Sequence, residues 1–385
     1  MAANQDSAAT IDRLRREFPI ADSHVFLNHA GVGPTSLRVV DAVGDFMTSM
    51  AHLGRPSFDD WEAIADGCRD RFAKMIGAVP EEIAFIRNTS HGLSLVASGL
   101  DWRAGDRIAV ATAVEYPSNV YPWLDLQNRG LVQVDDIEAP GGVVTVEAVE
   151  RALRPETRLL AVSSAQYATG GVTDLTALGT LCRDRGVLFC VDGIQTVGAL
   201  PVDVKSAGIH FMSADSHKWM LGMMGIGAIY VDREVIPHVH PPLIGWRSTT
   251  DSFNFDRVHL ELVDTAVRFE EGSLAYPLIA GFAAALDILL EVGVPETAAH
   301  VGRLVERLAD GLSSIGCLVG PEESARRHIA TFTHPGLDGE VMLESLHAAR
   351  IVTSYRRGAV RVSPHFYNTN EDMDRVVDTV RRLVQ

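Results

Sequence analysis

The chain has 385 residues, 46% of them hydrophobic and 22% charged, which is the composition of an ordinary folded protein long enough for more than one core. Its formal net charge of −16 leaves no basic surface for a nucleic-acid backbone, so nucleic-acid binding is not expected as the main activity. Because no apolar run reaches the roughly 20 residues of a membrane span and the N-terminus lacks a signal-peptide core, we expect a cytoplasmic protein without a membrane partner.

Short β-branched segments alternate with helical segments through the middle of the chain. The predicted strands are RIAVA 107–111, LLAVSS 159–164, VLFCVD 187–192, HFMSA 210–214 and IGAIYV 226–231. A helix is predicted in DLTALGTLCRDRG, where Gly186 fits the position after the last turn. Strands that alternate with helices predict an α/β fold with a mostly parallel sheet covered on both faces.

The chain after about residue 270 has a different pattern, typical of a smaller α+β domain. Its predicted elements are helices at 277–293, 298–316 and 370–384, with short strands near 327–334 and 351–364. The division that we expect is an N-terminal segment packing on the small domain (1–20), a large domain (21–270) and a small C-terminal domain (271–385).

Polar side chains gather at the ends of three predicted strands, and Gln166 and Tyr167 follow the first of them, at 159–164. One strand ends in Asp192, and Gln195 comes shortly after it. The next strand is followed by His217 and Lys218. Because ligands of open α/β sheets bind beyond the carboxyl ends of the strands, we expect these side chains to gather at one site.

Lys218 is one of only three lysines among 34 basic residues. Lys74 falls on the polar face of a predicted helix and Lys205 in a predicted surface loop, which leaves Lys218 as the candidate for chemistry. Pyridoxal phosphate needs an amine for a Schiff base, an acid for its pyridine nitrogen, a phosphate cup and a flat group over the ring. Lys218, Asp192, the helix start at 89–91 and an aromatic side chain would supply all four.

The motifs VDGIQTVG and, further on, SADSHKWMLGMMGIGAIYV resemble the class V aminotransferase family of fold-type I pyridoxal-phosphate enzymes. That family includes cysteine desulfurases, isopenicillin N epimerase-like proteins and C–S lyases. The resemblance runs from FLNHAGVGPTS to VRVSPHFYNTNEDMDRVV, which is nearly the whole chain. It implies a large domain that binds pyridoxal 5'-phosphate and a smaller α+β C-terminal domain.

The resemblance also implies roles for individual residues. It makes Lys218 the Schiff-base lysine and puts Asp192 on the pyridine nitrogen and Gln195 on the phenolic oxygen of the ring. The residues that it places around the phosphate are Ser90, His91 and His217.

The resemblance covers three further positions. Two of them, Tyr116 and Ser273, differ from the residue usual in the family, and the third, Arg361, matches it. Tyr116 stands where the family often has a ring-stacking histidine. Ser273 in RFEEGS replaces a threonine that reaches the phosphate of a partner subunit, so the resemblance implies a homodimer with shared sites. Arg361 matches the arginine that clamps the substrate carboxylate as a bidentate pair.

The cysteines argue against one branch of the family. Desulfurases carry a nucleophilic cysteine shortly before the clamping arginine, and the matching segment HAARIVTSYRRGAVRVS has none. The four cysteines of the chain are scattered without the spacing of metal ligands, and Cys317 lies in an apolar stretch, so we expect buried, reduced thiols and no metal site. Persulfide transfer is therefore disfavoured.

For an amino-acid substrate joined to the cofactor as an imine, we favour a C–S β-lyase acting on a cysteine conjugate in small-molecule biosynthesis. This reaction needs Lys218 as a base and no protein thiol. Transamination, epimerisation, and decarboxylation with or without oxidative deamination remain as alternatives, and a cofactor-free interaction protein is a rival of another class. The candidates for lining a pocket for a polar conjugate are His29, Tyr121, Arg356 and Arg357.

Overall fold

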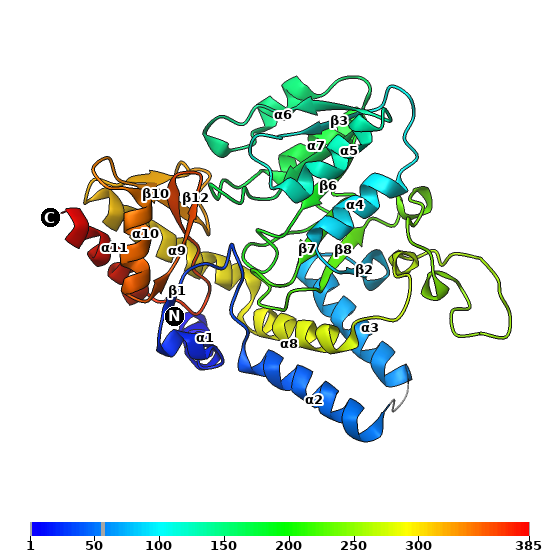
Figure 1. The fold of residues 1–385 in the computed structure, drawn as a ribbon, viewed down its shortest axis with the longest axis horizontal. Coiled ribbons are helices and arrows are strands. Elements are labelled where there is room, and N and C mark those ends of the chain that lie inside the picture. The colour runs from blue at the N-terminus through cyan, green and yellow to red at the C-terminus, as the bar shows by residue number, and fades with distance from the viewer. Residues whose placement is uncertain (1, 55–57, 385) are drawn as a thin grey trace.

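The computed structural model describes residues 2–54 and 58–384, and its largest element is a seven-stranded sheet (Figure 1). The strands of this sheet are β2 (Ile83–Ile86), β3 (Arg107–Val110), β4 (Gln133–Asp136), β5 (Thr157–Ser163), β6 (Leu188–Asp192), β7 (Phe211–Asp215) and β8 (Gly227–Val231). Their order is β2-β8-β7-β6-β5-β3-β4. The run from β4 to β7 is parallel, and β8 is antiparallel to both neighbours.

All five predicted strands are present, as β3, β5, β6, β7 and β8. The two others were missed. β4 reads QVDD and is half-exposed at the edge of the sheet, so it lacks the apolar pattern of a buried strand.

Helices cover both faces of the sheet, because alternate strand residues point to opposite sides. On β5, Leu160 and Val162 join one apolar cluster, while Leu159 and Ala161 join the other. The helices of the first cluster are α3 (Phe58–Ile76), α6 (Val146–Ala152), α7 (Leu175–Arg185) and α8 (Tyr276–Val292), with α2 (Leu37–Leu53) packed on α8. Those of the second are α4 (Thr89–Gly99) and α5 (Tyr121–Asn128). The α7 helix ends at Gly186 in the left-handed conformation with φ of 63°, as predicted.

The C-terminal part forms a separate four-stranded antiparallel sheet (Figure 1). Its strands are β9 (Leu318–Gly320), β10 (Ala330–Thr333), β12 (Ser354–Arg356) and β13 (Ala359–Val362), in the order β12-β13-β10-β9. The helices of this part are α9 (Val294–Ser313), α10 (Gly339–Ala348) and α11 (Asn370–Val384). A short strand β1 (Val25–Phe26) pairs in parallel with β11 (Ile351–Val352), and α1 (Ala2–Arg15) packs against α8.

The division into domains stays a prediction, and two contacts bear on its boundaries. Ile279 and Phe282 of α8 belong to the apolar cluster of the large sheet, although the prediction starts the small domain at residue 271. Val25 of β1 belongs to the cluster of the small sheet, although it falls in the predicted large domain. In the described residues, only α8 and α9 taken together across a 74° bend have the length and apolarity of a membrane span, and no single helix does.

Candidate active site

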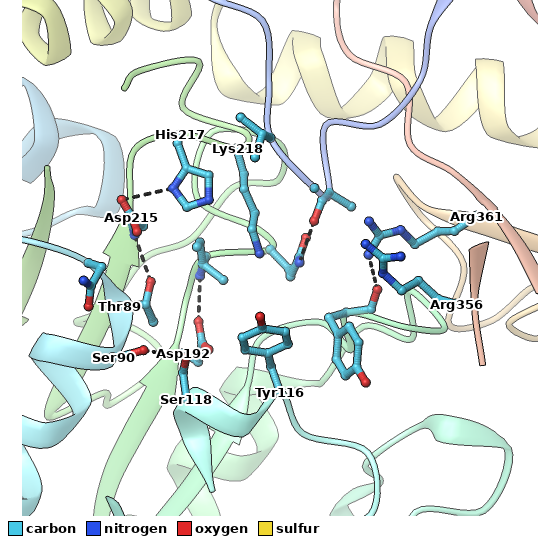
Figure 2. Close-up of a pocket in the computed structure, with 17 residues that line it drawn as sticks. Thr89, Ser90, Tyr116, Ser118, Asp192, Asp215, His217, Lys218, Arg356 and Arg361 are labelled. Carbon is cyan, nitrogen blue, oxygen red and sulfur yellow. Dashed lines mark hydrogen bonds and ion pairs between the residues drawn. The ribbon is translucent and has the colours of Figure 1, made fainter. Parts of the chain in front are cut away.

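A cavity of about 410 Å³ opens where β6 and β7 end and where the small sheet faces the large one. Seven of the ten residues predicted for the site line it together: Ser90, Tyr116, Asp192, Gln195, His217, Lys218 and Arg361. In Figure 2 those that are labelled, which are all of them except Gln195, point toward one another from separate segments of the chain. Their roles toward a cofactor and substrate remain predictions, and the geometry below bears on each.

Lys218 projects its amine into the cavity, where Nζ lies 5.8 Å from the centre of the Tyr116 ring (Figure 2). Burial lowers the pKa of this amine to about 8, Asp192 opposes the shift, and Arg361 adds to it. A neutral amine is the nucleophilic form, so Lys218 is partly reactive near neutral pH. The backbone is held close by Gly33, whose N–H donates to the His217 carbonyl at 2.7 Å and where a Cβ would lie 2.6 Å from the Lys218 oxygen.

Asp192 lies at the bottom of the cavity and is 2% exposed. One carboxylate oxygen accepts the Ile194 N–H at 3.0 Å, and the other has no donor in the described part of the chain. Burial, with a contribution from the charge of Glu115, raises the pKa of Asp192 to about 7. A cationic N–H brought against the open oxygen would stabilise the carboxylate form.

Gln195 has its side chain oriented by two neighbours. Its Oε1 accepts from Trp219 Nε1 at 3.0 Å, and its Nε2 donates to the Ala30 carbonyl at 3.2 Å. Because an indole N–H can only donate, the oxygen must face Trp219 and the amide nitrogen must face the other way. The second amide hydrogen is left to donate to an acceptor in the cavity, as the predicted contact with a phenolic oxygen requires.

The start of α4 forms the polar end of the cavity. Asn88 caps the helix by accepting the His91 N–H at 2.9 Å, and the Ser90 and Ser118 hydroxyls lie 2.6 Å apart. His217 Nδ1 lies 3.1 Å from Asp215 Oδ1, so that acid has a cationic partner when the imidazole is protonated. Free N–H groups at a helix start and nearby hydroxyls form a site for an anion such as phosphate.

Arg361 lies on the opposite side, on β13, and is 1% exposed. Its guanidinium donates to the Tyr167 carbonyl and, at 3.3 Å, to Asn28 Oδ1, while the buried Nε has no partner in the described residues. Burial, with repulsion from Arg356, lowers the pKa of Arg361 to about 9. A buried cation that lacks an acidic neighbour favours the entry of an anion.

Three predicted site residues lie elsewhere. His91 and Ser273 line a second cavity of about 400 Å³ together with Gly272. The prediction that Ser273 reaches the site of a partner subunit stays a prediction, and Ser273 does not line the active-site cavity of its own chain.

His29 is a correction to the predicted substrate-binding residues. It is fully buried outside the cavity, and its two ring nitrogens contact the Ser363 carbonyl at 2.8 Å and the Tyr367 hydroxyl at 2.7 Å. Because both polar atoms already have protein partners, neither is available to a substrate. The sequence around His29 could not reveal these partners, which come from distant segments of the chain.

One buried acid beside the site was missed. Glu115 accepts from the Ser163 N–H at 2.7 Å, Gln166 Nε2 at 2.9 Å and Asn119 Nδ2 at 3.0 Å. It thereby joins the segment of Tyr116 to that of Tyr167, whose rings meet edge to face at 5.1 Å. Its place directly before the predicted stacking residue is the only signal that the sequence carries.

The residues of the cavity fit pyridoxal phosphate. Asp192 has an open carboxylate oxygen for a protonated ring nitrogen, and Gln195 has a free amide hydrogen for the phenolic oxygen. The start of α4 with Ser90 and Ser118 suits the phosphate, and Lys218 supplies the amine. The group would supply an electron sink for charge that develops on a bound amino acid.

Comparisons with known proteins identify the family of this chain. The family model described as aminotransferase class-V matches residues 25–376. The chain is 30% identical to a probable cysteine desulfurase of Methanothermobacter thermautotrophicus, over 96% of this chain and 97% of that protein. It is 29% identical to an uncharacterized aminotransferase, YcbU, of Bacillus subtilis, with 96% and 97% covered.

Two solved structures show the same fold. The apo cysteine desulfurase of Thermococcus onnurineus NA1 matches with a TM-score of 0.88 at 26% identity, over 97% of this chain and 98% of that one. A complex of the cystine C–S lyase C-DES with its product cysteine persulfide matches with a TM-score of 0.88 at 23% identity, over 96% and 99%. The predicted fold-type I architecture is thereby confirmed. The chain belongs to the class-V aminotransferase family and, like the family, is a pyridoxal-phosphate-dependent enzyme.

Proposed function

We propose that the enzyme is a C–S β-lyase that converts an S-substituted cysteine and water into a thiol, pyruvate and ammonia, as a step of small-molecule biosynthesis. The observation that carries the proposal is the position of the cysteines: all four are buried, and none lines the cavity. Relatives called cysteine desulfurase and a neighbour called cystine C–S lyase support chemistry at a C–S bond. A β-lyase releases the sulfur on the departing thiol, so it needs no thiol of the protein.

The chain's own groups suit that reaction. Arg361 would hold the substrate carboxylate with its fork of N–H donors, and Asp192 would keep the ring nitrogen protonated. Lys218, once free of the cofactor, would take the proton from Cα, because burial lowers the pKa of its amine to about 8. The same amine then carries a proton that can pass to the departing sulfur.

Cysteine desulfurase is the second candidate, because of the names that several relatives bear. It would require a protein thiolate to take the sulfur. Burial raises the pKa of every thiol in the chain above its usual value, which lowers the fraction of thiolate. Both the location and the chemistry of these thiols favour the lyase.

Product analysis with a panel of S-substituted cysteines and free cysteine tests the proposal. We expect equal amounts of thiol, pyruvate and ammonia, and none with Lys218→Ala. Alanine with a persulfide on the protein would establish the desulfurase instead. A keto acid that retains sulfur would indicate transamination, a D-amino acid epimerisation, and release of CO₂ decarboxylation, and each of these would overturn the lyase.

A further inference from the structure

A second arginine, Arg356, lines the cavity beside Arg361 (Figure 2). The register of the β12–β13 hairpin explains why. Ser354 lies opposite Arg361, and Arg356 is two residues beyond Ser354 on the same strand. Side chains two residues apart point to the same face of a strand, so both guanidiniums leave the same face as diagonal neighbours.

The turn of the hairpin separates Arg356 from Arg357. Arg356 pairs with Ala359, which leaves a two-residue turn, and Arg357 and Gly358 have φ of 48° and 85°. Arg357 itself does not line the cavity: its Nη1 donates to the Ala113 carbonyl at 2.6 Å, and its guanidinium lies 5.7 Å from the centre of the Tyr167 ring. Of these two arginines, only Arg356 lines the cavity.

The cationic pair has no acid to balance it in the described residues. Arg356 makes one hydrogen bond, to the Tyr355 carbonyl at 2.7 Å, and Arg361 donates only to uncharged oxygens. The two acids that line the cavity, Asp192 and Asp215, form no ion pair with either arginine in the described residues, and Asp215 lies beside His217 instead. Repulsion from Arg356 also contributes to the lowered pKa of Arg361.

One substrate carboxylate would neutralise only one of these charges. In a chain with a net charge of −16, an unbalanced pair of cations that lines a cavity favours a second anion in the ligand. We propose that Arg356 binds a second carboxylate, at the end of the substrate's side chain, so that the enzyme acts on amino acids with a side-chain acid. The second carboxylate site is argued from the two arginines alone. The proposal rests on the proposed function only in taking the C–S bond as the bond that the enzyme cleaves.

A pair of substrates that differ in one charge tests this directly. S-carboxymethyl-L-cysteine carries the second carboxylate, and S-carbamoylmethyl-L-cysteine is its uncharged isostere. We expect the holoenzyme to favour the acid by about 10- to 100-fold in kcat/KM, the range of a charge-assisted hydrogen bond in a partly buried site. Arg356→Gln should reduce that preference to within about threefold, and Arg356→Lys should retain part of it.

The matched control is Arg357→Gln, which removes a neighbouring charge that does not line the cavity. It should leave the preference within about twofold of the parent. If Arg357→Gln lowers the preference for the acid over the amide as much as Arg356→Gln does, the preference comes from the overall positive charge near the cavity. The assignment of Arg356 is then wrong. If Arg356→Gln weakens both substrates equally, Arg356 helps to hold the α-carboxylate and the proposal also fails.

A binding experiment separates this proposal from the reaction type. Analogues of the two compounds without the α-amino group cannot react, and their affinity for the holoenzyme is measured by calorimetry. We expect the dicarboxylate to bind at least about tenfold more tightly than the amide, and Arg356→Gln to abolish the difference. This result without any lyase activity would overturn the proposed function and leave the second subsite standing, whereas equal binding by the parent enzyme would overturn the subsite.

Discussion

Arg361 is almost fully buried, and its only described hydrogen-bond partners are a backbone carbonyl and an amide oxygen. Burying a charge without a counter-charge costs free energy, and the lowered pKa of this guanidinium, about 9, expresses that cost. A substrate carboxylate would relieve it. The sequence could predict the arginine from its motif, but it could not show that the site around it lacks an acid.

Arg361→Ala should lower kcat/KM by about two to three orders of magnitude, because truncating one partner of a shielded ion pair costs roughly 2–5 kcal/mol. Arg361→Lys should recover part of the loss, since an ammonium cannot form the same fork. Steady-state kinetics measure the change, and the absorbance of the bound cofactor should be normal in both variants. A kcat/KM within about threefold of the parent would rule out the clamp.

The lowered pKa of Lys218 predicts how the uptake of the cofactor depends on pH. Burial lowers the pKa of its amine to about 8, and only the neutral amine attacks the aldehyde of pyridoxal phosphate. The rate at which apoprotein takes up the cofactor, followed by absorbance, should therefore rise with pH through about 8. Arg361→Gln should move this midpoint upward, because Arg361 contributes to the lowering. A midpoint at the value of an ordinary lysine, near 10.4, would show that the amine is not desolvated.

The β12–β13 hairpin is the element that carries both cavity arginines. Its register depends on a two-residue turn in which Arg357 and Gly358 take positive φ. The sequence shows the Arg-Gly pair but not the register, which decides whether Arg356 or Arg357 lines the site. The same limit explains β4, whose polar residues form an edge strand only because β3 lies beside them.

Gly358→Ala tests the link between this turn and the site. The φ of 85° strains any residue with a Cβ by about 1 kcal/mol, while the added methyl group itself would meet open space. We expect a small loss of stability together with a lower kcat/KM, because the arginines shift with the hairpin. Gly105→Ala, at φ of 99° in open space outside the cavity, is the control that should cost stability without affecting kcat/KM. If Gly358→Ala and Gly105→Ala lowered kcat/KM equally, the turn of the hairpin would have no specific effect on the site.

At the scale of the molecule, the cavity is assembled from both sheets. Asp192 ends β6 and Lys218 follows β7, both in the large sheet, whereas Arg361 belongs to the small sheet. The sequence could predict the first group, because strand ends meet at one edge of a parallel sheet. It could not predict that Arg361 lines the same cavity, since this depends on how the small sheet packs against the large one.

The predicted dimer can be tested by mixing two inactive variants. Lys218→Ala removes the amine, and Ser273→Asp places a negative charge on the segment expected to meet the partner's phosphate. If sites are shared, a mixed dimer has one intact site, and random exchange of subunits should restore about a quarter of the parent activity. Labelled subunits confirm that mixed dimers form. Their formation without any recovery would show that each chain builds its site alone.

Two buried histidines of the C-terminal part bind segments that follow strands of the large sheet, and they should make the free energy of unfolding depend on pH. His328 donates to the Gln195 carbonyl at 2.5 Å and His365 to the Trp219 carbonyl at 2.9 Å, so two residues of the small domain hold the segments that carry the cofactor contacts. Burial lowers the pKa of both imidazoles to about 4. In the unfolded chain a histidine titrates near 6.5, so between about pH 6.5 and 4 the unfolded state binds protons that the folded state does not.

Stability should therefore fall as pH decreases through this window, by about 2 kcal/mol for each histidine between pH 7.5 and 5. Urea unfolding at the two pH values measures the fall. His328→Asn, whose amide can still donate to the Gln195 carbonyl, should reduce it by about 2 kcal/mol, because one titrating group is gone. The exposed His238→Asn should leave it nearly unchanged. A fall of the same size in the parent and in His328→Asn would mean that groups other than this histidine cause the acid sensitivity, and that the contact between the two sheets does not depend on its charge.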